Sequence, residues 1–529
     1  MKGWLRARAQ WRDFHGDTSG IALLYITVML PVVVGLALLA VDVGRIWNLQ
    51  SSLQHGSDAL ALAGAGELDQ RPDAIDRANR AIANLVATNK SVFGTTVVTI
   101  DENSIGQPCY SASLPADPLP YPACMPASTA TEREASSATA RFVRVTVTPV
   151  SFNTIFPVSF LGGSNSSASS AEAVAGFQAA VCNFTPLFIC NPFEPPTGVT
   201  DVFADYGLYA HIASIANRRR IFQFKSHDNA SQWSPGNYGF LEANAGPGAK
   251  ALGQSIAAPY SAGCYVQNGV YTKPGNTTVL KNAFNVRFDL YDGSYKKDDY
   301  PPAQNVRKGH IVKKLSGGGT AQACNDSNHI SAYTSILANP AYDVVMGLPR
   351  DSCFATNSCT LAGGRMGNGD WGGDTASSVT VPDFEQYWAT NFGGSRPNDP
   401  SGTQYSNSNL PTRYDIYRYE IDNSLLATNS AGRTISGKTY NENGLPNCNT
   451  GAGMAIPDRR IIYGAILNCR AAGLGPGAGG PYQSVAFGKF FMTEPMADPP
   501  DSTLWAELVD VVKPGQADSV ARDIVQLYR

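Results

Sequence analysis

The stretch SGIALLYITVMLPVVVGLALLAVDVGRIWNLQSSLQHGSDALALAGA, residues 19–65, decides how the chain is organised. Its first half, residues 21–41, contains no charged residue. At about 1.5 Å of rise per residue, a helix of this length crosses the roughly 30 Å hydrocarbon core of a bilayer. Pro31 lies near the middle, where membrane helices tolerate the loss of one backbone hydrogen bond. The sequence therefore predicts a transmembrane helix; the alternative is a buried core helix, although core helices rarely run this far without a charge.

The charges on either side of the span predict its orientation. Arg45 follows the span closely, and four basic residues precede it. Those four are Lys2, Arg6, Arg8 and Arg12. The positive-inside rule places residues 1–18 in the cytoplasm as a basic tail and the rest of the chain on the far side. A cleaved signal peptide is the alternative, but its apolar region would be shorter and would end in a small-residue cleavage site. Because the span continues through Asp42 into a helical pattern, we expect an uncleaved anchor.

An amphipathic stripe continues the helix beyond the span. Its apolar residues recur at steps of three, four and seven, which is helical spacing. They are Ile46, Leu49, Leu53, Leu60 and Ala63. Small residues, from Gly56 to Gly64, would let another helix approach closely. The stripe packs either on the protein's own domain or on another chain, and the sequence leaves both possibilities open.

The order of these residues resembles the N-terminal segment of TadG-like proteins, which are components of the Tad (Flp) tight-adherence pilus machinery of bacteria. The resemblance is strongest in this segment, and the later segments Cys182–Pro195, Pro235–Leu241, Asn285–Asp289 and Arg459–Cys469 also resemble parts of the longer TadG-related proteins. The residues that it marks for membrane insertion and assembly are Gly20, Pro31, Asp42, Gly44, Arg45, Leu53, Gln54, Asp58 and Ala59. One departure is that the family usually has Ala-Ala-Asp-Ala-Ala-Ala where this chain has Gly56-Ser-Asp58-Ala-Leu-Ala61.

The resemblance implies a single-pass protein of the bacterial inner membrane, with its bulk in the periplasm and with other Tad/Flp pilus proteins as partners. Pilins of this system also have a glycine before an apolar span. The fifth residue after Gly20 is Tyr25 rather than the glutamate of those pilins, so we do not expect a major pilin or cleavage by a prepilin peptidase. Whether the chain forms an oligomer stays open.

Composition agrees with an exported, loop-rich protein. Charged residues make up 16% of the chain, below the roughly 25% of typical soluble domains, and the net charge of −3 creates no field for nucleic acid. All ten cysteines follow the anchor, and an even number in an oxidising compartment predicts disulfides. Short loops favour the pairs Cys109–Cys124, Cys182–Cys190, Cys353–Cys359 and Cys448–Cys469, which leaves Cys264 with Cys324.

The pattern beyond the anchor predicts an α+β chain. The expected parts are a cytoplasmic tail (1–18), the anchor and helical stalk (19–66), a small α+β domain (67–182) and a larger β-rich periplasmic domain (183–529). In the small domain we expect a helix over 72–90, strands over 95–100 and 142–148, a flexible turn or linker over 161–172, and a strand or short helix over 171–180. In the larger domain we expect strands over 285–290, 459–467, 485–492 and 504–512.

Motifs for catalysis or cofactor binding are missing from the sequence. The six histidines show no metal-ligand spacing, and neither a nucleophile elbow nor a P-loop occurs. Two loops hold weak Ca²⁺ candidates, namely Asp289 with Asp292, and Asp370 with Asp374, although turn chemistry explains the same residues. Some TadG-like proteins carry a von Willebrand A domain with a D-x-S-x-S metal site. No such run occurs, so we expect no intact metal-site domain of that kind.

The expected function is therefore non-enzymatic: assembly or anchoring of a Tad/Flp pilus through protein contacts. One alternative is a membrane-held adhesin or glycan-binding protein. The aromatic segment around Trp371, Tyr387 and Trp388 suits that role, unless those rings belong to the core. Another alternative is a periplasmic hydrolase with two carboxylates far apart in the sequence.

Overall fold

The computed structural model describes most of the chain. The described residues are 19–69, 71–86, 90–93, 96–99, 104–112, 114, 123–137, 139–182, 184–202, 204–226, 233–242, 248–260, 264–266, 269–273, 280–312, 324–325, 329–331, 346–373, 383–428, 433–435, 438–440, 442–449, 451, 453–455, 458–475, 477, 479–496, 503–512 and 521–528. The expected tail, residues 1–18, and Asp374 lie outside them. Two compact units result, Met1–Gln178 with Ile524–Arg529, and Ala179–Asp523.

The first unit is built on one long helix, α2 (Ser19–Ala65), which confirms the helix predicted for the anchor and its extension. Pro31 lies inside this helix. A second helix, α3 (Ala74–Val86), packs against α2 and is shorter than the predicted range of 72–90. Arg77 of α3 bonds Glu67 at 2.7 Å and Asp69, both in the connection, so charge-assisted hydrogen bonds fix the turn between the helices.

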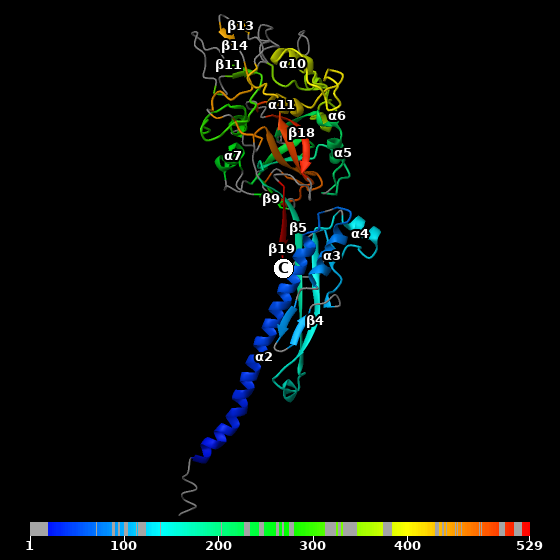
Figure 1. Cartoon of the computed structure of the whole chain (residues 1–529), viewed down its shortest axis with the longest axis vertical. Helices are drawn as coiled ribbons and strands as arrows, with labels where there is room; N and C mark the ends of the chain where they lie inside the picture. The colour runs from blue at the N-terminus through cyan, green and yellow to red at the C-terminus, as the bar shows by residue number, and fades with distance from the viewer. Residues whose placement is uncertain are drawn as a thin grey trace, which may run out of the picture. The chain divides into compact units, whose positions relative to one another are not determined.

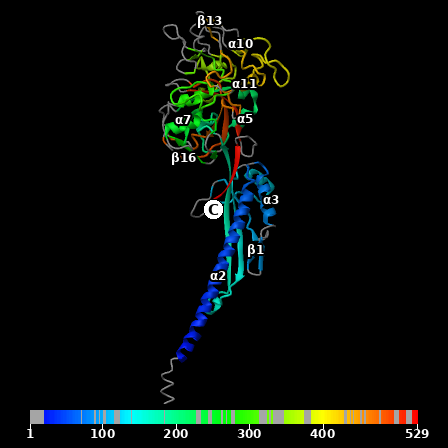
Figure 2. The same ribbon diagram turned by 60° about the vertical axis from the view of Figure 1, so that its left-hand side comes forward.

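A sheet with the strand order β19-β5-β4-β3 packs beside these helices (Figures 1 and 2). Its strands are β3 (Cys109–Ser111), β4 (Phe142–Asn153), β5 (Ser166–Cys182) and β19 (Ala521–Leu527). The unit also has a hairpin of β1 (Lys90–Phe93) and β2 (Thr96–Thr99), the helix α4 (Ala130–Ser137) and the 3₁₀ turn η2 (Val158–Leu161).

The prediction of a flexible turn over 161–172 is wrong for most of that range. β5 begins at Ser166, and Asn153 lies opposite Ser166 in an antiparallel register that continues to Phe142 opposite Gly176. Serine-rich sequence has little strand preference of its own, so pairing with β4 determines this conformation.

The second unit contains a ring of strands. In order these are β8 (Asn237–Leu241), β6 (Leu187–Cys190), β15 (Ile461–Leu467), β17 (Ala486–Met492), β18 (Leu504–Val512) and β7 (Ile221–Ser226), and β7 pairs back with β8. The sheet extends from β8 through β10 (Val270–Lys273) to β16 (Gly479–Tyr482). β15 is buried on both faces: Ile462 and Ile466 join one apolar cluster, and Ile461 and Ala465 join the other.

Short elements surround this ring. The helices are α5 (Leu208–Ala213), α6 (Ile215–Arg218), α7 (Ala249–Ala257), α8 (Lys281–Asn285), α10 (Phe384–Asn391) and α11 (Arg413–Asp422). The 3₁₀ turns are η4 (Val286–Phe288), η7 (Ser352–Phe354) and η8 (Ala362–Gly364). The hairpins are β11 (His310–Val312) with β12 (His329–Ser331), and β13 (Arg433–Ile435) with β14 (Lys438–Tyr440). β9 (Cys264–Val266) pairs with the end of β5.

The strand predicted over 285–290 is wrong, because α8 and η4 cover most of this range. The turn ends at Asp289, which adopts a left-handed conformation with φ of 63°. The side chains of Val286, Arg287 and Phe288 are all buried. The alternation of polar and apolar residues that suggested a strand therefore does not correspond to one exposed face and one buried face.

All ten cysteines are paired, in a pattern that differs from the short-loop prediction. The pairs Cys109–Cys124 and Cys353–Cys359 are confirmed. The predicted pairs Cys182–Cys190, Cys448–Cys469 and Cys264–Cys324 are wrong: the structure has Cys182–Cys264, Cys190–Cys469 and Cys324–Cys448. Strand pairing explains two of the differences, since Cys182 lies opposite Cys264 and Cys190 ends a strand parallel to the one that precedes Cys469.

Candidate functional site

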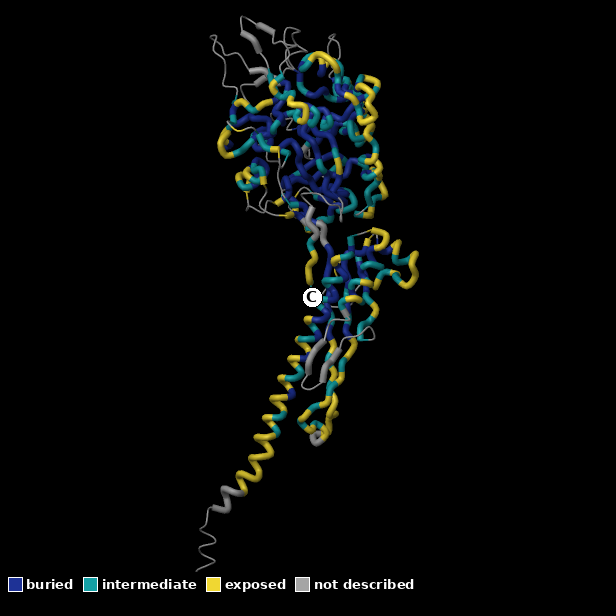
Figure 3. The backbone as a smooth tube through the Cα atoms, viewed as in Figure 1, coloured by how far each residue is buried: buried dark blue, intermediate teal, exposed yellow. Residues whose placement is uncertain are grey.

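The first half of α2 is an exposed apolar rod. Residues Leu24–Ala65 form the one helix among the described residues that is long and apolar enough to cross a membrane by length and composition, with a mean hydropathy of 2.6 in its most apolar window. None of that window is buried, and Figure 3 shows this half in the colour of exposed residues. A core helix would be covered by its own protein, so the structure gives no support to the buried-helix alternative.

Asp42 joins the end of this rod to a distant part of the chain. Its two carboxylate oxygens accept hydrogen bonds from the backbone N–H groups of Ile155 at 3.1 Å and Phe156 at 2.7 Å, at the tip of the β4–β5 hairpin. Arg45, one turn later, donates to the same carboxylate at 3.3 Å. Only 2% of Asp42 is exposed, and a buried carboxylate needs such partners. Asp42 thus fastens the hairpin tip to the helix.

The amphipathic stripe packs on the protein itself. Leu49, Leu53 and Leu60 are buried, and Ile46 and Ala63 are half-buried. Because α2 contacts α3, β1 and β4, the intramolecular alternative accounts for this stripe.

Polar residues of the same segment add to this packing. The side-chain amide of Gln54 donates to Asp58 Oδ1 at 2.8 Å and to the backbone carbonyl of Glu172 in β5 at 2.9 Å. Gly64 lets α3 and β4 approach, since a Cβ atom there would lie 2.7 Å from Ile82 Cδ1 and 3.4 Å from Val143 Cγ1.

The other residues marked by the sequence differ in their exposure. Pro31 and Gly44 are exposed, Ala59 is half-buried, and Gly20 lies in the first turn of the helix. A Cβ atom added at Gly44 would have no neighbour within 4 Å. Trp47 is 71% exposed, and Ser51 and His55 continue the same exposed face. The helix therefore has one face occupied by its own domain and one face open.

Hydrogen-bond donors surround two of the aspartates considered for Ca²⁺. Asp289 accepts the backbone N–H groups of residues 447–449 at 2.6–3.0 Å. Asp370 accepts from Ser352, Asn368 and the backbone of Gly372, and these donors hold its pKa below the usual value against the effect of burial. Such donors favour the turn interpretation. Asp292 is half-buried, and among the described residues no three His, Cys, Asp or Glu side chains cluster to hold a metal ion.

The aromatic segment of the second unit belongs to its core. Trp371 and Tyr387 are at most 1% exposed and Trp388 is 4% exposed, within one apolar cluster. The Trp371 indole N–H donates to the Pro411 carbonyl at 3.1 Å. These rings are therefore not an exposed sugar-binding face.

Buried carboxylates in the second unit are paired with arginines. Arg413 lies between Asp351 and Glu507, with both N–O distances 2.8 Å and all three side chains fully buried. Burial raises the pKa of Glu507 to about 7, although Arg413 opposes that shift. Glu420 is likewise buried beside Arg307.

One pocket, of about 480 Å³, lies elsewhere in this unit. Its described lining is Pro196, Thr197, Gly198, Val199, Trp233, Cys469, Arg470, Gly473, Leu474 and Gly475, which includes neither an acidic residue nor a histidine. None of the paired carboxylates lines this pocket, whereas Asp351 lines a smaller cavity of about 90 Å³.

Sequence reasoning missed the partners of the helix. Four residues contact the stalk segment or fix its end, namely Ile155, Phe156, Glu172 and Arg77. Only one feature of the sequence pointed to any of them. That feature is the run from 145 to 171, which contains no charged residue and includes the hairpin tip.

Comparison with known proteins identifies the same segment. Residues 20–67 match the family model described as "Putative Flp pilus-assembly TadE/G-like". Comparisons with curated proteins and with solved structures gave no match. The match covers α2 and the start of its connection to α3, which includes Asp42, Leu53 and Gln54. The N-terminal segment is thus similar to the TadE/G-like family, as the resemblance implied.

Proposed function

We propose that this chain is a membrane-anchored, non-enzymatic component of Tad/Flp pilus assembly that acts through protein contacts. One observation carries the proposal. The TadE/G-like segment coincides with a single helix whose first half is apolar and exposed and whose second half is fixed to a folded unit by Asp42 and Leu53. Such a helix would set the position of the folded unit relative to the membrane, because the contacts of its second half prevent it from bending there.

The orientation and location follow from the same features. The basic residues at the start favour a cytoplasmic N-terminus. The second unit would then fold in the periplasm, which suits its disulfides because they persist in oxidising compartments.

The partner contact is proposed for the open face of the helix. The buried residues of the stripe, Leu49, Leu53 and Leu60, belong to the part of α2 that packs on the protein's own elements, so they are not accessible to another chain. The open face includes Gly44, Trp47, Ser51 and His55, next to the exposed apolar half. In a bilayer, that apolar half would pack on other membrane helices by close contact of small residues and van der Waals packing.

The anchoring is tested by fractionation of the native host and mass spectrometry of the N-terminus. We expect an intact chain in the inner membrane that resists extraction by alkaline carbonate. A soluble chain beginning near Asp42 would contradict the anchor, and a chain beginning after Gly20 would mean pilin-like processing.

The partner contact is tested by photocrosslinking in the host. A photoreactive residue at Ser51 or His55 should join the chain to another pilus-machinery protein. The same residue at Ala135 in α4, which is also exposed but lies away from α2, is the control. Equal products from all three positions would contradict a contact at the open face.

Contact rather than catalysis is proposed for the second unit as well. Its fully buried Glu507 and Glu420 are engaged by arginines, and its 480 Å³ pocket has no acidic residue in its described lining. A hydrolase would need two carboxylates that converge on an accessible substrate. The adhesin alternative loses its aromatic support because Trp371, Tyr387 and Trp388 are buried.

A further inference from the structure

The tip of the β4–β5 hairpin, residues 154–165, is apolar although it lies in a loop. No charged residue occurs between Arg144 and Glu172, and the tip reads TIFPVSFLGGSN. Ile155 is 51% exposed, and Phe156 and Val158 are half-buried. Exposed loops usually carry polar and charged side chains, so this composition suits a surface that is not facing bulk water.

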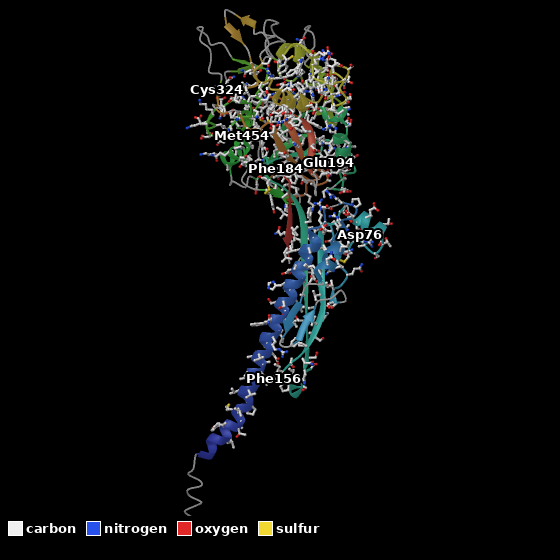
Figure 4. The ribbon with its side chains drawn as sticks, in the orientation of Figure 1. Asp76, Phe156, Phe184, Glu194, Cys324 and Met454 are labelled. Carbon is white, nitrogen blue, oxygen red and sulfur yellow. A yellow bond between two sulfur atoms is a disulfide. The ribbon has the colours of Figure 1, made fainter. Side chains whose placement is uncertain are left out.

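The tip lies beside the apolar half of α2. Phe156 approaches so closely that a Cβ atom at Gly35 would be 3.4 Å from its Cε2 atom, and Figure 4 shows Phe156 next to the helix. Gly35 is six residues before Val41, the end of the charge-free span. At about 1.5 Å per residue this places Phe156 roughly 9 Å inside the span.

Asp42 keeps the tip at this depth. Its carboxylate accepts the N–H groups of Ile155 and Phe156, so two backbone groups that would otherwise enter an apolar region without partners are satisfied. Trp47, which is 71% exposed, lies on the other side of Asp42 from the span, where membrane proteins place amphipathic aromatic rings.

We infer that the hairpin tip dips into the membrane interface next to the helix, as a second membrane contact of the first unit. The inference rests on the proposed anchoring of α2. The occupant of this surface is lipid, at the boundary of headgroups and acyl chains on the side where Val41 leaves the bilayer. Lipid is favoured over a protein partner because the tip is continuous with the apolar half of α2, most of which is exposed and would lie in the bilayer.

A helix with this second contact would be held in rotation and tilt as well as in depth. A single span fixes neither its rotation nor its tilt by itself, because neighbouring helices and interfacial anchors set them. The folded unit would then present the open face of α2 in a fixed direction within the membrane plane.

The test uses the full chain in nanodiscs with a fluorescent amino acid introduced by codon reassignment, because the ten cysteines are all paired. Quenching by nitroxide-labelled lipids, with the label shallow or deep in the acyl chain, is measured at Ile155. Leu30 in the span is the positive control, and Ala135 in α4 is the negative control; both are exposed in the free chain.

We expect quenching at Ile155 to be severalfold stronger than at Ala135, and strongest with the shallow label. Leu30 should be quenched best by the deep label. If Ile155 behaves like Ala135 while Leu30 is quenched, the inference is wrong and the anchor stands. If Leu30 is not quenched either, the proposed anchoring itself fails.

A second measurement separates lipid from protein as the occupant. A photoreactive residue at Ile155 in the native host should yield adducts with phospholipid, identified by mass spectrometry. A protein adduct in place of the lipid adduct would overturn the inference, because it would show that another chain covers the tip.

Discussion

Replacement of Asp42 by asparagine should loosen the hairpin tip. The carboxylate accepts two backbone hydrogen bonds, at 2.7 and 3.1 Å, and is only 2% exposed. Asparagine has one oxygen to offer, and its NH₂ group would face the second N–H. D42N therefore leaves one backbone donor unsatisfied and makes the remaining bond neutral.

The size of this effect follows from ordinary hydrogen-bond energies. A bond to a charged group contributes about 1.5–3 kcal/mol, and a neutral one contributes about 1 kcal/mol. Losing one bond and weakening the other should reduce the free energy of local opening by about 2–5 kcal/mol, which is a roughly 30- to 5,000-fold rise in the opening equilibrium.

Hydrogen exchange of the full chain in nanodiscs measures this directly. Peptides that cover residues 150–162 should exchange faster in D42N by about that factor, because exchange follows the opening equilibrium. Asp58→Asn is the matched control: Asp58 lies on the same helix and, among the residues that the structure describes, accepts from Gln54 alone, which an asparagine oxygen can still do. Equal exchange at the tip in wild type and D42N would refute the role of Asp42, and equal acceleration by D58N would show that the effect is not local.

Three further changes test the packing and charges described above. Gly64→Leu should destabilise the first unit by about 1–3 kcal/mol because Ile82 leaves no room, whereas Gly44→Leu should change the thermal midpoint little, since nothing lies within 4 Å. Arg413→Met should cost about 3–5 kcal/mol because it leaves two buried carboxylates without a counter-charge. Arg418→Met should cost less than about 1 kcal/mol, because its pair with Asp422 is exposed and Asp458 lies 4.0 Å away; urea denaturation compares the two. Burial lowers the pKa of His211 to about 4, so the folded state binds its proton less readily than the unfolded chain does. Stability should therefore be lost as pH falls from about 6.5 through 4, by at most about 1.4 kcal/mol per pH unit. His211→Phe should flatten this part of the pH profile of unfolding.

Local pattern was sufficient wherever a segment's own residues determine its structure. The helix of 19–65, the strand from Phe142 and the strands predicted over 459–467, 485–492 and 504–512 all appear close to their expected bounds. The strands combine continuous or alternating apolar residues with burial on at least one face, and the helix does so in its second half. In these segments propensity and burial agree, so the sequence alone predicts the element.

Elements determined by distant partners were not predictable from local pattern. β5 starts in serine-rich sequence because β4 pairs with it, and β19 joins the same sheet from the other end of the chain. The pair Cys190–Cys469 spans 279 residues, which a preference for short loops excludes in advance. Loop-closure entropy grows only slowly with length, so short loops are a weak guide once strands bring cysteines together.

Some residues of the family segment have a structural role within this chain, and others have none. Asp42 satisfies two converging backbone N–H groups, and Leu53 and Gln54 fix the helix to the sheet. These roles are intramolecular and would hold in any membrane. No intramolecular contact explains a glycine at position 44, since a Cβ atom there would have no neighbour within 4 Å. A glycine in a helix also lowers stability relative to alanine by roughly 0.5–1 kcal/mol. Close approach of another helix is the physical reason that would offset this cost, so Gly44→Leu should spare the fold and impair piliation.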